Sequence, residues 1–321
     1  MSDLRDENKP TVVVSRCLGF SKCRYNGDVI ESDFVQGLKE HVNFITVCPE
    51  VEIGLGIPRD PVRLVTEQGK IELYQPATGK LYTQEMNQYA SDFFESADRI
   101  NGFILKGRSP SCGIKDVKIY LGKEKSSASM KGAGLFASHA MKHYPYLPIE
   151  EEGRLTNYAI REHFLTKLYT FFRFQKVKDS NSMKELVKFH ADHKYLLLAY
   201  NQTESRILGK IAANHEKKPF KEIIEKYELH LGLAFAKLPS RNNYVNAFLH
   251  IFGYFSDTLT SKEKAFVLDR FQKYKEEKIH MSVVLNLLRT YVIKYDHDYL
   301  LDQTIWAAYP EELLDIGDSG K

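Results

Sequence analysis

Three short apolar runs, each leading into a loop with a cysteine, constrain the fold of this chain most strongly. Thr11–Ser15 leads into the loop with Cys17, residues 44–47 into that with Cys48, and residues 103–105 into that with Cys112. Runs of this length, rich in Val, Ile and Phe and closed by turn residues, are typical of buried strands in a parallel sheet. Ligands of an open α/β sheet bind outside the carboxyl ends of its strands, so we expect the three thiols to converge. Three convergent thiolates form a soft-metal site with one coordination position left open.

The pattern of apolar residues changes in the middle of the chain, which indicates two domains. A length of 321 residues exceeds most single compact domains. Residues 146–149 have the character of a last strand, and the acidic stretch 150–155 follows them. Beyond residue 155 the apolar side chains recur at spacings of three and four, as in Ile160, Phe164 and Leu168. We therefore predict an N-terminal Rossmann-like α/β domain with a parallel sheet and a C-terminal all-α domain.

The same periodicity predicts individual helices in both domains. In the first domain they cover residues 84–96 and 132–143, and in the second 182–200, 221–231, 243–255, 261–275 and 281–294.

Composition and charge set the broad class of protein. No apolar stretch approaches the roughly 18 residues of a membrane span, and the polar residues 1–8 contain no signal-peptide core. We expect a cytoplasmic protein, where a reducing environment disfavours disulfides among its four cysteines. Residues 1–155 carry 20 Lys/Arg and 21 Asp/Glu, and residues 156–321 carry 25 and 21. The mild positive charge of the second part permits a polyanion partner without requiring one.

Polar side chains in the loops after the strands are candidates for chemistry. Glu50 follows Cys48 by two residues, and a carboxylate beside a metal site can act as a general base or acid. Ser109 and Ser111 flank Pro110 just before Cys112, where their hydroxyls either bind a ligand or form an ordinary turn. The cations that would reach the same rim, unless they are simply solvated, are Arg24, Arg59 and Lys106.

Five motifs together resemble the thiouracil desulfidase (TudS) family over residues 11–152. They are Val14-Ser-Arg-Cys-Leu-Gly19, Arg24-Tyr-Asn-Gly27, Cys48-Pro-Glu50, Gly54-Leu-Gly-Ile-Pro-Arg59 and Ser109-Pro-Ser-Cys-Gly113. Residues 155–310 resemble the helical YbgA-like domain through Phe189-His-Ala-Asp-His193, residues 250–255, Glu263-Lys264 and Tyr299-Leu-Leu-Asp-Gln303. The fused arrangement resembles the RudS-type desulfidases, which act on 4-thiouridine in transfer RNA.

The resemblance implies a cofactor, a reaction and roles for particular residues. The family holds a 4Fe-4S cluster with three cysteines, which map to Cys17, Cys48 and Cys112, and its fourth iron site is open or holds an exogenous ligand. Glu50 and Ser109 take the family's acid/base and substrate-orienting positions. Residues assigned to substrate binding are Ser111, Arg24 and Lys106. Cys23 stays outside this ligand set, and Asn26 replaces the aspartate common in the family.

The implied reaction is a non-redox, hydrolytic desulfuration that releases sulfide. We expect the helical domain to bind the transfer RNA, and its basic candidates are Lys210, Lys217, Lys218, Lys221, Lys273, Lys275 and Lys278. His190 and His193 share a helix face but lack further ligands, so a structural or RNA-contacting role is favoured over a metal. Two alternatives stay open: a desulfidase of free thiouracil or thionucleosides, and a non-catalytic iron–sulfur RNA-binding regulator or zinc module.

Overall fold

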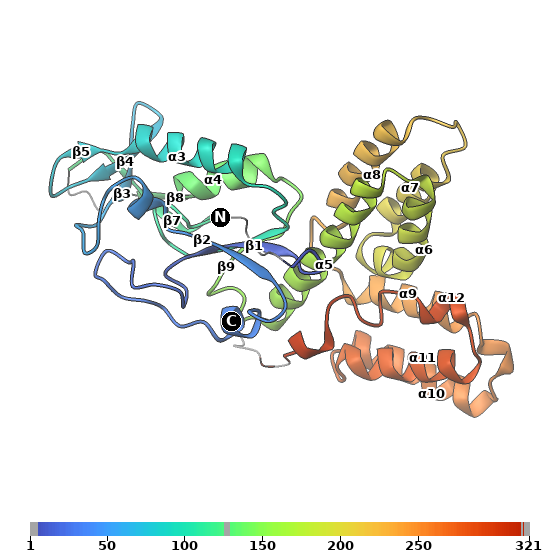
Figure 1. The fold of residues 1–321 in the computed structure, drawn as a ribbon. Helices are drawn as coiled ribbons and strands as arrows, with labels where there is room; N and C mark the ends of the chain where they lie inside the picture. Colours follow the sequence, from blue (N-terminus) through green and yellow to red (C-terminus); the bar gives the residue numbers. More distant parts are fainter. Residues whose placement is uncertain (1–5, 125–128, 316, 318–321) are drawn as a thin grey trace. The chain divides into compact units, whose positions relative to one another are not determined.

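The computed structural model describes residues 6–124, 129–315 and 317, and the chain divides into two compact units (Figure 1). The first unit contains the described residues up to Leu168 and those from Glu312 onward, and the second runs from Tyr169 to Glu311. Most of the polar N-terminus, on which the expected cytoplasmic location rests, lies outside the described residues. Within those residues, no helix has the length and apolar character needed to cross a membrane.

A four-stranded parallel sheet forms the centre of the first unit. Its strands are β1 (Thr11–Ser15), β2 (Asn43–Val47), β6 (Gly102–Leu105) and β9 (Ile149–Glu151), in the order β2-β1-β6-β9. Every neighbouring pair is parallel, so the three strands that precede the cysteine loops lie side by side with their carboxyl ends at one edge. The predicted parallel-sheet α/β domain is confirmed.

Apolar side chains on both faces bury this sheet, which explains its continuous apolar runs. Val13 and Phe103 share one core cluster with Phe94 of α3 (Thr83–Ser96) and Phe136 of α4 (Leu135–His143). The rings of Phe94 and Phe136 stack at 5.0 Å between centroids. On the opposite face, a Cβ at Gly102 would lie 3.1 Å from Leu168 Cδ1. The sheet thus has helices on both sides, as parallel sheets require.

A second sheet in the first unit was not predicted from the sequence. Its strands are β3 (Arg63–Glu67), β4 (Lys70–Gln75), β5 (Lys80–Leu81), β7 (Val117–Leu121) and β8 (Ser129–Gly132), in the order β5-β4-β3-β7-β8. β3 pairs parallel with β7, and the other neighbours pair antiparallel. The β3–β4 hairpin turns at Gln68 and Gly69, whose φ angles are 52° and 80°. A two-residue turn with two positive φ angles suits a hairpin. Such turns usually carry Asn-Gly or Asp-Gly, and Gln at the first position here does not predict one.

The remaining helices of the first unit are short. They are α1 (Asp33–Gly37) and α2 (Pro49–Glu52). The long helix α5 (Tyr158–Ser180) begins in this unit and ends in the second. Cys48 is the residue that precedes the first turn of α2, so this helix starts directly at the end of β2.

Among the described residues of the second unit, every regular element is a helix, which confirms the all-α prediction. Its elements are α6 (Met183–Tyr200), α7 (Gln202–Ala213), α8 (Phe220–Ala234), α9 (Arg241–Phe252), η1 (Ser256–Thr258), α10 (Ser261–Lys275), α11 (Met281–Lys294) and α12 (Asp298–Leu301), and η2 (Glu311–Leu313) lies at its end. Side-chain caps begin several of them: Ser182 accepts a hydrogen bond from the Glu185 N–H, and Thr260 forms a capping box with Glu263. Helix α7 was not predicted.

Two histidines of α6 are part of the core of the second unit. His190 Nδ1 lies 3.0 Å from the Tyr227 hydroxyl, and His193 Nδ1 lies 2.8 Å from the carbonyl oxygen of Phe189. Burial lowers the pKa of His190 to about 4 and that of His193 to about 3. Both rings are therefore neutral packing groups near pH 7, in the structural role that their spacing favoured.

These histidines predict a loss of stability in mild acid. In the unfolded chain they take up protons near pH 6.5, whereas in the folded unit they do so only near pH 4 and 3. The unfolded state therefore binds more protons between these values, and the free energy of unfolding falls as the pH falls from 7 to 5. Thermal unfolding followed by circular dichroism should show a Tm that decreases over this range. His193→Phe should weaken the dependence and exposed His215→Gln should not; a Tm independent of pH would contradict the prediction.

Candidate active site

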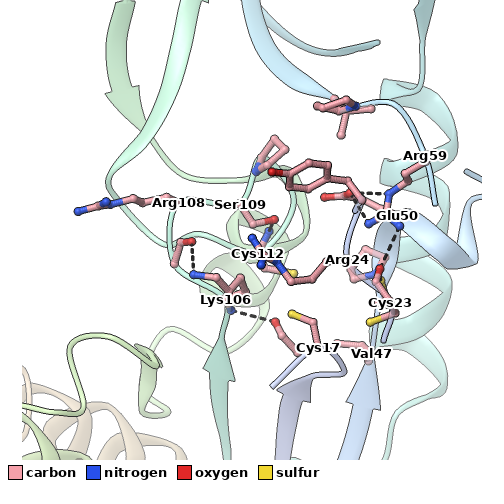
Figure 2. Close-up of a pocket in the computed structure, with 18 residues that line it drawn as sticks. Cys17, Cys23, Arg24, Val47, Glu50, Arg59, Lys106, Arg108, Ser109 and Cys112 are labelled. Atoms are coloured by element: carbon pink, nitrogen blue, oxygen red, sulfur yellow. Dashed lines mark hydrogen bonds and ion pairs between the residues drawn. The ribbon is translucent and has the colours of Figure 1, made fainter. Parts of the chain in front are cut away.

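All four cysteines line one pocket at the carboxyl ends of β1, β2 and β6 (Figure 2). The cavity has a volume of about 370 Å³. Cys17 follows β1 by two residues, Cys48 follows β2 directly, and Cys112 lies in the loop after β6. The structure thus brings together the three thiols that are far apart in the sequence, at the sheet edge where parallel strands converge.

Local hydrogen bonds hold the Cys112 loop in a compact turn. The hydroxyl of Ser109 accepts hydrogen bonds from the backbone N–H groups of Ser111, at 3.2 Å, and Cys112, at 3.1 Å. Gly134, just before α4, packs so closely that a Cβ there would lie 2.5 Å from the backbone of Ser111. Helix α4 therefore fixes the position of the loop, and with it the Cys112 thiol.

Cys23, which the resemblance leaves outside the ligand set, also lines the pocket, as does Arg108, which the sequence did not single out. Only 1% of the surface of Cys23 is exposed, and its carbonyl oxygen accepts hydrogen bonds from the Cys48 thiol at 3.7 Å and from Arg59 Nη1 at 3.0 Å. Its thiol interacts with those of Cys17 and Cys48, and the hydrogen bond with Cys17 is the main cause of a raised Cys23 pKa. The five residues between Cys17 and Cys23 in one turn-rich loop were the available signal.

The surroundings of the thiols favour their protonated, neutral form, which a bound cation would change. The pKa of Cys48 is raised, first by the hydrogen bond with Cys23 and then by burial. Burial raises the pKa of Cys112 to about 12. Neutral thiols in such a setting become thiolates when a bound metal supplies the compensating positive charge.

Glu50 is held rigidly at the wall of the pocket. Its Oε2 accepts hydrogen bonds from Arg59 Nε at 3.0 Å and Nη2 at 2.7 Å, and its Oε1 accepts one from the Ser111 hydroxyl at 2.9 Å. The side chains of Arg59 and Glu50 are only 4% and 12% exposed. A carboxylate has about four acceptor positions, so these three hydrogen bonds leave room for one further donor, such as a water molecule.

The other predicted site residues lie in different surroundings. Ser111 is fully buried and does not line the pocket; it reaches the site through Glu50. Ser109 lines the pocket. Lys106 also lines it, but its ammonium group pairs with Glu152 and donates to the Gly107 carbonyl at 2.9 Å.

Arg24 lines the pocket with its guanidinium 5.7 Å from the ring centroid of Tyr25. Arg24 and Ser109 are therefore closer to a small ligand in the cavity than Ser111 is. Figure 2 shows Arg24 and Cys112 near the centre of the drawn pocket, with Glu50 and Arg59 joined at its upper right.

The thiols of the pocket are chemically compatible with the ligands of an iron–sulfur cluster. In the described part of the chain, no group of three or more His, Cys, Asp and Glu side chains is arranged to hold one ion. A cubane cluster binds each cysteine through a different iron, so its ligands stand further apart than those of one ion. Thiols that follow three separate strands and surround one cavity fit that requirement.

Comparisons with known proteins match both parts of the chain. The 2-thiouracil desulfurase family matches residues 12–152, and a domain of unknown function, DUF1722, matches residues 194–310. The uncharacterized protein YbbK of Bacillus subtilis (strain 168) is 33% identical over 109 residues, which are 32% of this chain and 72% of YbbK. The uncharacterized protein YbgA of Escherichia coli (strain K12) is 20% identical over 158 residues, 49% of this chain and 93% of YbgA.

A solved structure is also similar to part of the chain. It is the [4Fe-4S]-dependent thiouracil desulfidase TudS (DUF523Vcz), with 29% sequence identity, a TM-score of 0.37, and coverage of 46% of this chain and 93% of that one. YbbK is matched over more than two thirds of its length at more than 30% identity, and the family match covers the whole cysteine pocket. The chain therefore belongs to the 2-thiouracil desulfurase family and carries a DUF1722 domain behind its desulfurase domain.

Proposed function

We propose that this protein is a transfer-RNA desulfidase that converts 4-thiouridine to uridine and releases sulfide. Membership of the desulfurase family supports the reaction type. The observation that carries the proposal is the pocket itself, in which three strand-end thiols surround a cavity whose wall holds the partnered carboxylate of Glu50. The fused helical domain supports a substrate larger than a free base.

Cys17, Cys48 and Cys112 would hold a 4Fe-4S cluster whose remaining iron has no protein ligand. When bound, the cluster would supply a Lewis-acidic iron with affinity for the soft sulfur of a thiocarbonyl group. Cys23 is buried beside Cys17 and Cys48. We assign it the role of packing against these two thiols, because the three other cysteines follow three separate strands and can surround the cavity.

The chain's own residues would direct water to the substrate. Glu50 accepts a proton from a water molecule, and the oxygen of that water attacks the carbon that carries the sulfur. Arg59 and Ser111 fix the orientation of the Glu50 carboxylate. Ser109, at the wall of the pocket, offers its hydroxyl to the nucleobase of the substrate. The balance is C=S plus H₂O giving C=O plus H₂S, so no electron donor or acceptor is needed.

The surface of the second unit favours one group of the predicted RNA-binding lysines. Within the described residues, no ion pair involves Lys210, Lys217 or Lys221, and all three are exposed. The fourth member of this group, Lys218, pairs with Glu216 at 2.6 Å and with Glu222 at 3.5 Å. In the other group two of the three lysines are paired: Lys273 with Asp269 at 3.0 Å and Lys278 with Glu276 at 2.6 Å. Unpaired lysines contact phosphates at lower cost, so we assign RNA binding to the α7–α8 end of this unit.

The proposal predicts the loss of 4-thiouridine from RNA. Thiolated transfer RNA should be incubated with the anaerobically reconstituted full chain and then digested for nucleoside analysis by mass spectrometry. We expect conversion of 4-thiouridine to uridine, and none with Cys112→Ala, which removes a thiol from the pocket. An unchanged RNA pool with a fully loaded protein would contradict the proposal. Turnover of free 4-thiouracil under those conditions would favour the alternative substrate class.

A second prediction concerns the carboxylate. Glu50→Gln keeps the size of the side chain and removes its capacity to accept a proton, so kcat should fall by about 10²–10⁴-fold while iron content stays at the wild-type level. Glu52→Gln is the matched control, since Glu52 lies on the same helix, pairs with Arg16 and does not line the pocket. Full turnover of Glu50→Gln would exclude Glu50 as the general base.

A further inference from the structure

A second pocket of the first unit shares a wall with the cysteine pocket. Its volume is about 410 Å³, and Val62, Arg108 and Pro110 line both cavities. The rest of its lining comes from β3, β7 and β8, together with Asp116 beside β7. These strands belong to the second sheet, which the reaction proposed above does not use. A ligand in the cysteine pocket would therefore have a neighbouring cavity at its side.

This second pocket carries a surplus of positive charge. Its lining includes four cationic side chains, Arg63, Arg108, Lys118 and Lys131, and one carboxylate, Asp116. Lys131 pairs with Asp116 at 3.0 Å. In the described part of the chain, no ion pair engages Arg108 or Lys118, and Figure 2 shows Arg108 extending away from the cysteines. The uncompensated cations would attract an anion to the cavity.

Arg63 gives the pocket a fixed cation. Its guanidinium lies 5.8 Å from the ring centroid of Tyr74 and 5.0 Å from that of Tyr120. Its Nη2 donates to the carbonyl oxygens of Lys123, at 2.6 Å, and Glu124, at 3.1 Å. Its Nε is buried and has no acceptor among the described residues. Among the residues that the structure describes, the guanidinium is thus immobilised with no carboxylate partner, so the described lining of the pocket has more donors than acceptors.

We propose that this pocket binds a backbone phosphate of single-stranded RNA next to the thiobase in the cysteine pocket. The inference rests on the proposed function for the identity of the base. Phosphate is the anion that accompanies a nucleobase, and arginine and lysine are its usual ligands. The base must leave its stack to enter a pocket, and its flanking phosphates then follow the protein surface.

The spread of the cations favours RNA over a free nucleotide. All four cations line the cavity, but only Arg63 is partly buried. Arg108, Lys118 and Lys131 are exposed, and the Lys131 side chain is 73% exposed. A single terminal phosphate has no need of three further exposed cations around one fixed arginine. A chain of phosphodiesters that runs past the cavity contacts both Arg63 and the exposed cations.

The first test measures binding without chemistry. The full chain is titrated into a fluorescent, unthiolated single-stranded RNA, and anisotropy is recorded between low and moderate salt. Lys118→Gln with Lys131→Gln should weaken binding by about tenfold at low salt and reduce the slope of log K against log salt by about 1.4, or 0.7 for each phosphate contact. Lys80→Gln with Lys142→Gln is the control, since both lysines are exposed in the same unit and line neither pocket. Equal affinity and slope in the two double variants would overturn the inference.

The second test identifies the source of the phosphate and separates the two proposals. Turnover is measured on free 4-thiouracil, on 4-thiouridine 5′-monophosphate and on a thiolated oligonucleotide. The lysine double variant should raise KM about tenfold for the oligonucleotide alone and leave kcat unchanged for all three. An equal rise in KM for the monophosphate would reject RNA in favour of a free nucleotide. If the wild type binds RNA through these lysines but turns over none of the substrates, the proposed function fails and the phosphate site stands.

Discussion

The adjacent parallel pairing of β2, β1 and β6 is the constraint on which the rest of the site depends. Because these strands run in one direction, their following loops meet at one edge and carry Cys48, Cys17 and Cys112 to a common cavity. The pairing is stable because the strands are apolar on both faces and helices cover each face. A change that shifted one strand by a residue would turn its side chains to the opposite face and separate the thiols.

The site combines soft sulfur ligands with a rigid acid–base group. The hydrogen bond with Cys23 and burial raise the pKa of Cys48, and burial raises the pKa of Cys112, so these surroundings favour neutral thiols unless a cation binds. Glu50 is kept in place by the buried Arg59 and Ser111, so its free acceptor position faces a defined point. Buried ion pairs contribute little net stability, and their value here is the fixed geometry of the carboxylate.

The sequence predicted features that depend on local patterns and missed those that depend on long-range packing. Apolar runs and turn residues were enough to place β1, β2 and β6, and helical periodicity placed α6 and α11 nearly to the residue. The second sheet escaped because its β3–β4 turn lacks the usual Asn-Gly pair and its strands are half polar. The sequence assigned Ser111 to substrate binding and left Cys23 outside the ligand set. Only the folded loops show that Cys23 is buried beside two thiols and that Ser111 donates to Glu50.

Whether the cysteine pocket holds an iron–sulfur cluster on three thiols is the claim on which the proposed chemistry stands. Native mass spectrometry of the full chain, purified without oxygen, measures this directly through the mass and composition of what is bound. We predict one 4Fe-4S cluster per chain in the wild type, its retention in Cys23→Ser and its loss in Cys112→Ala. A zinc ion in the wild type, or a cluster retained in Cys112→Ala and lost in Cys23→Ser, would contradict the assignment of Cys17, Cys48 and Cys112.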